Sequence, residues 1–547
     1  MKTTESKLSL KSRELRPVLA GLAAVFALGL WHGLDVRDGI AATGNRWLYG
    51  WYGAAFVCGL LLLAGLGYLL LLGGKGRKWK LEQIFVVCGL GLGLLYLAIL
   101  PPLSAPDEVS HYISAYQVSN QMLGSTAADD MGRVLTRAQD AYIEDMEDVL
   151  ADDGSGRRED KSEVILGQTV SQDTYGTIHE LGFGGRGPEG TVSSYQPAVH
   201  TTRLAYIPQA LGITLARVLG LGSLGLLYLG RLFNLMFYCA MGYLTMRRMP
   251  FGRELIFGIG LLPMMLHLSA SMSYDVMIIS MSGYFLAVCL DLAYEARQVR
   301  LRDVAVLGAV MAVMGPCKMV YGVVAGLCLL IPVKKFGGWG KWLMAAAVVL
   351  GAFAVSMLVV NLQTVALYTG VTDRYVIWAD EPGYSFAQLL HSPFHVLKLF
   401  YNTLVWQGGE LFTGVIGGSL GNMDPVLNTP YVVILGLAVL LAMLALRKPG
   451  ESIRITRGQK VWIWFLCLLC LGALMFSMLL AWTPVSATMV QGVQGRYLLP
   501  LLPMFLLTLK NDRVVRTDCN DRVLLYWMAC MNVYVILRIF GTVCLRV

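Results

Sequence analysis

Long apolar segments run through this chain of 547 residues and limit what it can fold into. Many of them approach or exceed the roughly 20 residues that a helix needs to cross a bilayer. They cover residues 17–34, 50–73, 82–100, 224–246, 253–271, 275–294, 342–366, 430–447, 461–482 and 523–545. One aqueous core could not bury so much apolar surface, since 56% of the chain is hydrophobic and only 15% is charged. The sequence therefore predicts an integral membrane protein.

Helices are the expected form of these segments, because only helices and closed barrels satisfy every backbone polar group in lipid. Barrel strands carry no apolar runs of this length. Shorter apolar stretches at 304–315, 317–333 and 497–510 add to the count. We expect an all-α membrane protein with about 13 transmembrane or re-entrant helices.

Lysine and arginine indicate the orientation, because loops rich in them stay in the cytoplasm. Basic clusters occur at 2–16, 75–80, 247–253, 297–302, 334–341, 447–460 and 510–522, and they alternate with loops poor in basic residues. We therefore expect a cytoplasmic N-terminus and an extracytoplasmic polar loop at 101–203. The net charge of +8 follows from this topology and does not indicate nucleic-acid binding.

This topology divides the chain into six parts. They are a cytoplasmic N-terminus (1–16), the first three transmembrane helices (17–100), a large external loop with the candidate catalytic acid (101–203), a transmembrane core with an interfacial helix and a re-entrant hairpin (204–366), a second external loop (367–429) and the C-terminal transmembrane helices (430–547). The hairpin turns at Gly315-Pro316 and places Lys318 near its tip. Helical spacing over 108–122 predicts a short amphipathic helix on the membrane surface.

Two adjacent carboxylates follow the third apolar segment, in the sequence Pro106-Asp107-Glu108, and His111 follows them. If a helix begins at Pro106, as proline at a first turn favours, both carboxylates share a face with His111. Asp107 could then act as a general base that takes a proton from an acceptor hydroxyl, with His111 orienting it. Asp107 and Glu108 could instead hold a divalent cation. The alternative is a solvated helix start, where acidic residues are common.

A glycine-rich stretch, Gln491-Gly492-Val493-Gln494-Gly495-Arg496-Tyr497, lies at the expected outer end of the segment 497–510. Arg496 is the residue type that grips a phosphate with two donors, and Gln494 and Tyr497 would line the same substrate site. The alternatives are an arginine that reaches lipid headgroups and a tyrosine of the membrane's aromatic belt.

Ionisable residues inside apolar segments are functional candidates, because an ion in hydrocarbon is costly. Asp275, Lys318 and Arg231 are of this kind, and all three fall on the same expected side as Asp107. Their agreement predicts a substrate site that opens outward.

These motifs occur together with further residues in a fixed order along the chain. They are Pro101-Pro102, Pro106-Asp107-Glu108 with His111, Tyr206-x-Pro208, Arg231-x-x-Asn234, Pro263, Ser271–Asp275, Lys318-x-x-Tyr321, Pro332, Gly492–Tyr497 and Pro500. In this order, over residues 85–510, the chain resembles a bacterial membrane-protein family catalogued as domain of unknown function 2142. That family is similar to the GT-C superfamily of glycosyltransferases.

The resemblance implies an enzyme, because GT-C enzymes take sugars from polyprenyl-phosphate donors and keep an acidic residue in the first large external loop. It implies that Asp107, with Glu108, fills this role. It also implies that Arg496 and Lys318 contact the donor phosphate, and we expect Arg231 to contact it with them. The acceptor would be a cell-surface glycan or a lipid-linked glycan outside the cytoplasm.

We therefore expect an inverting glycosyltransferase of the cell membrane, with a divalent cation as the one cofactor to consider. The alternatives are a transporter or flippase of lipid-linked glycans, a glycan polymerase or ligase, and a non-catalytic scaffold. The absence of internal sequence repeats argues against the transporter, since many transporter folds are built from repeats.

Overall fold

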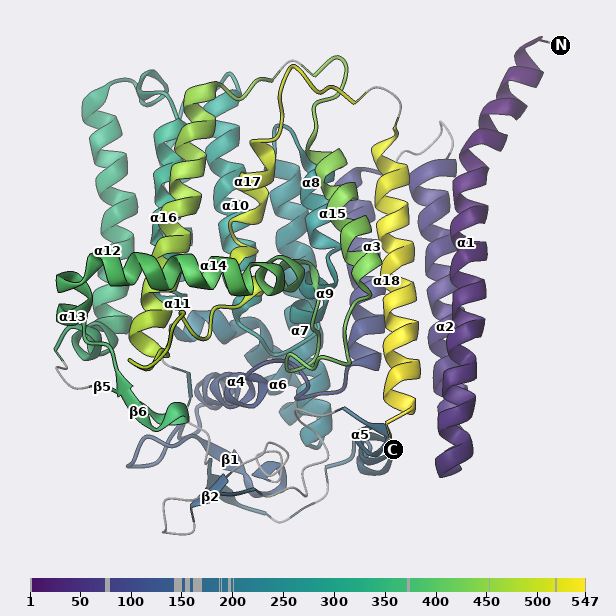
Figure 1. The fold of residues 1–547 in the computed structure, drawn as a ribbon, viewed down its shortest axis with the longest axis horizontal. Helices are drawn as coiled ribbons and strands as arrows, with labels where there is room; N and C mark the ends of the chain where they lie inside the picture. Colours follow the sequence, from purple (N-terminus) through teal and green to yellow (C-terminus); the bar gives the residue numbers. More distant parts are fainter. Residues whose placement is uncertain are drawn as a thin grey trace.

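The computed structural model describes residues 2–73, 79–141, 150–152, 158–160, 170–185, 187, 189–194, 198–199, 201–370, 374–451, 453–516 and 519–546. Most of these residues are helical, and the described strands form three separate antiparallel pairs. Figure 1 shows long helices side by side, with the N-terminus at the upper right and the C-terminus at the lower end. The architecture agrees with the prediction of an all-α membrane protein.

The α-helices are α1 (Lys2–Thr43), α2 (Trp47–Gly67), α3 (Leu81–Ile99), α4 (Glu108–Met122), α5 (Gln172–Leu181), α6 (Ile207–Val218), α7 (Ser223–Arg248), α8 (Arg253–Gly260), α9 (Pro263–Ser269), α10 (Asp275–Tyr294), α11 (Leu301–Cys317), α12 (Trp339–Gly370), α13 (Phe386–His391), α14 (Pro393–Ile416), α15 (Tyr431–Ala445), α16 (Arg457–Ala481), α17 (Leu502–Leu507) and α18 (Asp521–Cys544).

Shorter elements connect these helices. They are the π-helical turn η1 (Tyr68–Leu72), the 3-10 helices η3 (Arg203–Tyr206), η4 (Met319–Leu330), η5 (Val333–Phe336), η6 (Ile377–Ala379) and η7 (Gly495–Leu498), and the strands β1 (Leu135–Arg137), β2 (Leu150–Asp152), β3 (Arg158–Asp160), β4 (Thr191–Ser193), β5 (Arg374–Val376) and β6 (Glu381–Gly383). The strand pairs are β1–β4, β2–β3 and β5–β6.

Within the described residues, eight helices are long and apolar enough to cross a membrane. They are α1 from Glu14, α2 with η1, α3, α7, α10, α12 as far as Asn361, α16 and α18. α18 packs against α1, α2 and α3, and α3 packs against α7. The chain is a multi-pass membrane protein, as its composition predicts.

One expected span, residues 253–271, is wrong as a continuous helix, because it consists of the separate helices α8 and α9. Pro263 begins α9, and a proline disfavours the helical conformation in the residue before it. Leu262 accordingly has an extended ψ of 137°. The break leaves the carbonyl of Leu261 without a helical partner, and Asn532 of α18 donates a 2.8 Å hydrogen bond to it.

A second expected span, residues 430–447, holds only the 15-residue helix α15. At 1.5 Å per residue it is about 22 Å long, which is less than the roughly 30 Å of bilayer hydrocarbon. By length alone α15 falls short of a span.

The interval 367–429, expected as a loop, contains the 24-residue helix α14. Figure 1 shows α14 lying across the long helices rather than along them. Its apolar residues Phe394, Leu397 and Tyr401 follow helical spacing, and all three are exposed. Polar residues and Gly408-Gly409 interrupt this pattern in the sequence, which explains why it was not recognised as a helix.

The helix expected at 108–122 is present as α4, but most of its residues are buried within the protein instead of lying on a membrane surface. It packs against α6, and α6 packs against α7. Figure 1 shows α4 and α6 together at the lower end of the helical body. Elsewhere in the expected loop 101–203, residues 142–149, 153–157 and 161–169 lie outside the described part of the chain.

Candidate functional site

Four charged side chains meet where the start of α4, the start of α10, the end of α11 and η7 come together. Arg496, in η7, lies with its guanidinium NH2 3.3 Å from Asp107 Oδ2 and its Nε 3.3 Å from Asp275 Oδ2. Lys318, between α11 and η4, has its Nζ 3.5 Å from Asp275 Oδ1. We call Asp107, Asp275, Lys318 and Arg496 the charged cluster. The structure thus brings these sequence-predicted site residues together.

The members of the charged cluster differ in their access to solvent. The side chain of Asp107 is 67% exposed, whereas that of Arg496 is 6% exposed and that of Asp275 is 11% exposed. Lys318 is intermediate, at 20%. Asp107 is therefore the carboxylate that an incoming molecule can reach, and the other three charges lie beneath it.

Asp107 has a left-handed backbone conformation, with φ 56° and ψ 23°, and α4 begins at the next residue. Few residues other than glycine adopt this region, although aspartate and asparagine do so more readily than most. Such conformations cost about 1–3 kcal/mol and persist only where the surrounding structure determines them. The conformation of Asp107 is fixed first by the contacts of the next residue, Glu108.

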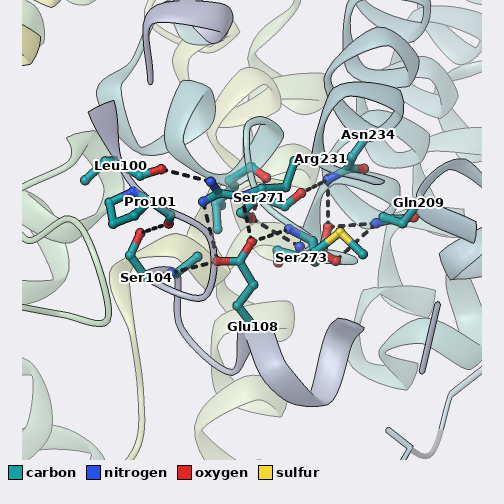
Figure 2. Close-up of polar contacts among 12 residues, drawn as sticks. Leu100, Pro101, Ser104, Glu108, Gln209, Arg231, Asn234, Ser271 and Ser273 are labelled. Carbon is teal, nitrogen blue, oxygen red and sulfur yellow. Dashed lines mark hydrogen bonds and ion pairs between the residues drawn. The ribbon is translucent and has the colours of Figure 1, made fainter. Parts of the chain in front are cut away.

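Glu108 and Arg231 form an ion pair that is completely buried, as Figure 2 shows. Arg231 Nε donates to Glu108 Oε1 at 2.9 Å, and Arg231 NH1 donates to the carbonyl of Leu100 at 2.8 Å. The backbone amides of Ala105 and Met272 also donate to the Glu108 carboxylate, at 3.0 and 2.9 Å. Both Glu108 oxygens are therefore in use, and the ion pair joins α4 to α7 and to the segment before α10.

The segment 271–275, which leads into α10, is held by further side-chain amides (Figure 2). Asn234 Nδ2 donates to the carbonyls of Ser271 and Ser273, at 2.8 and 3.2 Å. Gln209 Nε2 donates to the carbonyls of Met272 and Ser273, both at 3.2 Å. Since Asp275 ends this segment and Asp107 adjoins Glu108, one network places both carboxylates of the charged cluster.

The network changes the roles expected for Glu108 and Arg231. Both side chains have 0% exposure, so neither offers an atom to a substrate. A phosphate could contact Arg231 only by displacing Glu108 from it. We therefore treat Glu108 as a positioning residue instead of a catalytic one, and Arg231 as a positioning residue instead of a phosphate ligand.

A divalent cation between Asp107 and Glu108 was the expected metal site. The Glu108 oxygens already accept hydrogen bonds from Arg231 and from two backbone amides. Among the described residues, no three His, Cys, Asp or Glu side chains are grouped as metal ligands would be.

His111 is buried in α4, and its closest polar partner is Tyr206. Its Nδ1 lies 2.8 Å from the Tyr206 hydroxyl, and its ring meets the edge of Tyr274 with the centroids 5.1 Å apart. Burial lowers the pKa of His111 below its usual value, and the negative charges of Asp107 and Asp275 only partly oppose this shift. The expected partnership with Asp107 is replaced by one with Tyr206.

The stretch from Gly492 to Tyr497 depends on two glycines. Gly492 has a φ of 78°, which favours glycine. A side chain on Gly495 would lie 2.5 Å from the carbonyl oxygen of Leu411, so only glycine lets η7 approach α14 this closely. Gln494 precedes η7, and its carbonyl accepts a 3.1 Å hydrogen bond from the Tyr497 amide. The glycines in this motif therefore allow Arg496 to reach the charged cluster.

Tyr497 and Arg496 have side-chain contacts that suit a ligand site. Lys318 Nζ lies 3.6 Å from the centre of the Tyr497 ring, a cation–π contact. The Tyr497 carbonyl accepts a 2.6 Å hydrogen bond from the Tyr321 hydroxyl. Arg496 Nε is buried and makes no hydrogen bond in the described part of the chain, although Asp275 lies 3.3 Å away. The NH2 nitrogen, which lies 3.3 Å from the exposed Asp107, is therefore the part of the guanidinium nearest to an incoming ligand.

A cavity of about 800 Å³ adjoins the charged cluster, and Lys318 and Tyr497 belong to its lining. The remainder of the wall is mostly apolar and comes from α11, η4, α12, α13, α14 and α16, including Val323, Phe400 and Phe476. The sequence did not predict this cavity, because its wall is assembled from separate helices with no common motif.

Comparison with protein families gives a match that spans the site. A family model described as "Predicted membrane protein (DUF2142)" matches residues 90–505, which include the whole charged cluster and the buried ion pair. No curated protein and no solved structure matches the chain.

We predict that Glu108→Gln strongly destabilises the protein. The substitution leaves the buried guanidinium of Arg231 without its counter-charge, which costs about 3–5 kcal/mol in comparable cases. Thermal unfolding in detergent should show a large drop in melting temperature, and Glu108→Gln with Arg231→Gln should recover part of it. The matched control is the exposed Glu180→Gln, and equal melting temperatures for the two single variants would contradict the prediction.

We predict that acid destabilises the folded protein partly through His111. The pKa of His111 is lower in the folded state than in the unfolded chain. Below about pH 6.5, His111 therefore binds a proton in the unfolded chain more readily than in the folded protein. This contribution to stability is present above about pH 6.5 and is lost as the pH falls, by up to about 1.4 kcal/mol per unit. The melting temperature of His111→Gln should fall less than that of wild type between about pH 7.5 and 5.5. Parallel curves would contradict this assignment.

Proposed function

The chain belongs to the DUF2142 family of predicted membrane proteins, and we propose that it is an inverting glycosyltransferase that moves a sugar from a polyprenyl-phosphate donor to a glycan acceptor. One observation carries the proposal: the charged cluster, with a single exposed carboxylate, lies at the end of a large apolar cavity. The likeness that we expect between this family and the GT-C superfamily points to the same function.

The cavity suits the lipid part of such a donor. An isoprenoid chain is wholly apolar, and its transfer into an apolar wall is favourable by about 25 cal/mol for each Å² removed from water. Lys318 would meet the phosphate where the cavity reaches the charged cluster, because it belongs to both. Arg496, whose NH2 lies beside the exposed Asp107, would bind a second phosphate oxygen.

Asp107 would act as the general base. Its carboxylate takes the proton from the acceptor hydroxyl while that oxygen attacks the anomeric carbon of the donor sugar. The bond between this carbon and the phosphate oxygen breaks, and its electron pair leaves with the polyprenyl phosphate. Arg496 and Lys318 stabilise the negative charge that develops on the phosphate. A single displacement of this kind inverts the anomeric configuration.

The proposed topology places this reaction outside the cytoplasm. About 13 membrane segments would arise from the eight long spans together with α8–α9, α11, η4, α15 and η7–α17. The basic residues then hold the N-terminus inside, and the interval 101–203 lies outside with Asp107. The acceptor would therefore be a cell-surface glycan or a lipid-linked glycan.

The alternatives are weighed by the same contacts. A transporter or flippase would use intramembrane charges along a path, yet Arg231 is bound by Glu108 and Arg538 donates to the carbonyl of Asn428. A glycan polymerase or ligase would use the same cluster, because only the size of the transferred group differs. No contact described here favours transport over transfer.

We predict that Asp107→Asn abolishes transfer without unfolding the protein, because asparagine tolerates the left-handed backbone but cannot accept the proton. Purified protein in detergent is incubated with lipid-linked donors, and released polyprenyl phosphate is measured. The rate should fall about 10²- to 10⁴-fold, with the melting temperature unchanged. Glu180→Gln is the control that should keep the wild-type rate.

Two results would contradict the proposal. Release by Asp107→Asn at the wild-type rate would remove Asp107 from the chemistry. Absence of release by wild type in detergent, with movement of the same lipids across a sealed bilayer, would favour the flippase.

A further inference from the structure

Basic residues surround a cavity of about 400 Å³ at the end of α16 where that helix begins. We call its six cationic residues the basic pocket. They are Arg447, Arg454, Arg457, Lys460, Lys510 and Arg513. α16 has 25 residues and is about 37 Å long. The basic pocket lies at its first residues. Ala481, at its other end, is on the side of the charged cluster. Figure 1 shows the first turn of α16 at the upper end of the helical body, opposite α4.

The basic pocket carries more positive charge than its acidic neighbours neutralise. Asp512 lies in the wall and pairs with Arg447, and Lys510 Nζ lies 2.7 Å from Glu451 Oε1. Arg457 and Arg513 are exposed and have no ion-pair partner among the described residues. A cavity with this excess of charge is suited to an anion.

A second cavity, of about 450 Å³, lies farther along the same helix. Its wall is apolar and combines residues of α14, α15, α16 and α17, including Trp464, Leu502 and Phe505. Trp464 follows Lys460 by one helical turn, and its Nε1 donates a 3.0 Å hydrogen bond to Thr508 Oγ1 near Lys510. The basic pocket and the apolar cavity therefore follow each other along α16 and the chain after α17.

Positive charge at the membrane surface followed by an apolar wall at membrane depth matches an amphiphile with an anionic head. Trp464 and Leu468 line this cavity and are 43% and 60% exposed, so lipid can reach this face of α16. Basic pockets between membrane helices bind the head groups of anionic lipids for this reason. A soluble anion would use the basic pocket but would leave the apolar cavity without an occupant.

We propose that an anionic phospholipid occupies this face, with its phosphate in the basic pocket and an acyl chain in the apolar cavity lined by Trp464, Leu502 and Phe505. The site is distinct from the charged cluster, from which the length of α16 separates it. On the topology proposed above, the lipid comes from the cytoplasmic leaflet. The binding itself does not depend on sugar transfer.

The test compares two double variants that each remove two exposed arginine or lysine charges. Arg457→Gln with Arg513→Gln alters the basic pocket, whereas Arg302→Gln with Lys341→Gln alters basic residues elsewhere that are also exposed. The delipidated full-length protein in detergent is titrated with phosphatidylglycerol, phosphatidylcholine or inorganic phosphate. Melting temperature and native mass spectrometry report the binding, and the melting temperature without lipid verifies that each variant folds.

Phosphatidylglycerol should bind and stabilise wild type and the Arg302/Lys341 variant, and phosphatidylcholine and inorganic phosphate should not. The Arg457/Arg513 variant should bind it about 10- to 30-fold more weakly, since each basic residue near the surface contributes to anionic-lipid binding. Equal binding by both double variants would overturn the proposal. Equal stabilisation by inorganic phosphate would assign the pocket to a soluble anion, and equal stabilisation by phosphatidylcholine would remove the role of charge. None of these outcomes depends on transfer activity, so they are separate from the test of Asp107.

Discussion

The buried ion pair between Glu108 and Arg231 is the interaction on which the rest of the site depends. Two charges at 0% exposure are tolerable only when their hydrogen bonds are complete, because removing each from water is expensive. The carboxylate meets this condition with the guanidinium and two backbone amides. Those amides belong to the turn before α4 and to the segment before α10. The ion pair therefore sets where α4, α7 and α10 meet.

This arrangement explains how two carboxylates with different environments come to share one arginine. Asp107 adjoins Glu108 and is directed outward through a left-handed backbone, whereas Asp275 ends the segment held by Asn234 and Gln209. Arg496 then lies between them. Charges fixed in advance near an apolar cavity stabilise a developing negative charge without reorganising at the moment of reaction. The network thus provides the rigidity that a transfer reaction of this kind needs.

The sequence predicted the class of the protein and the membership of the charged cluster, because both depend on simple signals. Apolar runs identify membrane helices, and Asp275, Lys318 and Arg496 were conspicuous as charges in or beside apolar segments. The contact between Glu108 and Arg231 could not be predicted from the sequence, since 123 residues separate them. By residue type alone, each was a candidate functional residue. The break at Pro263 had a signal in the sequence, but the average apolarity of the segment outweighed it. α14 had a helical spacing of apolar residues at its start, but Gly408-Gly409 interrupts it. The cavity lined by Phe400 and Phe476 follows from tertiary packing, which no local pattern records.

The most direct measurement is a cryo-electron microscopy structure of the protein in lipid nanodiscs with added polyprenyl phosphate. The account predicts density for the phosphate in contact with Arg496 and Lys318, density for the isoprenoid chain in the cavity lined by Phe400 and Phe476, and an intact pair between Glu108 and Arg231. A phosphate bound away from the charged cluster, or Arg231 released from Glu108 to hold it, would contradict the account.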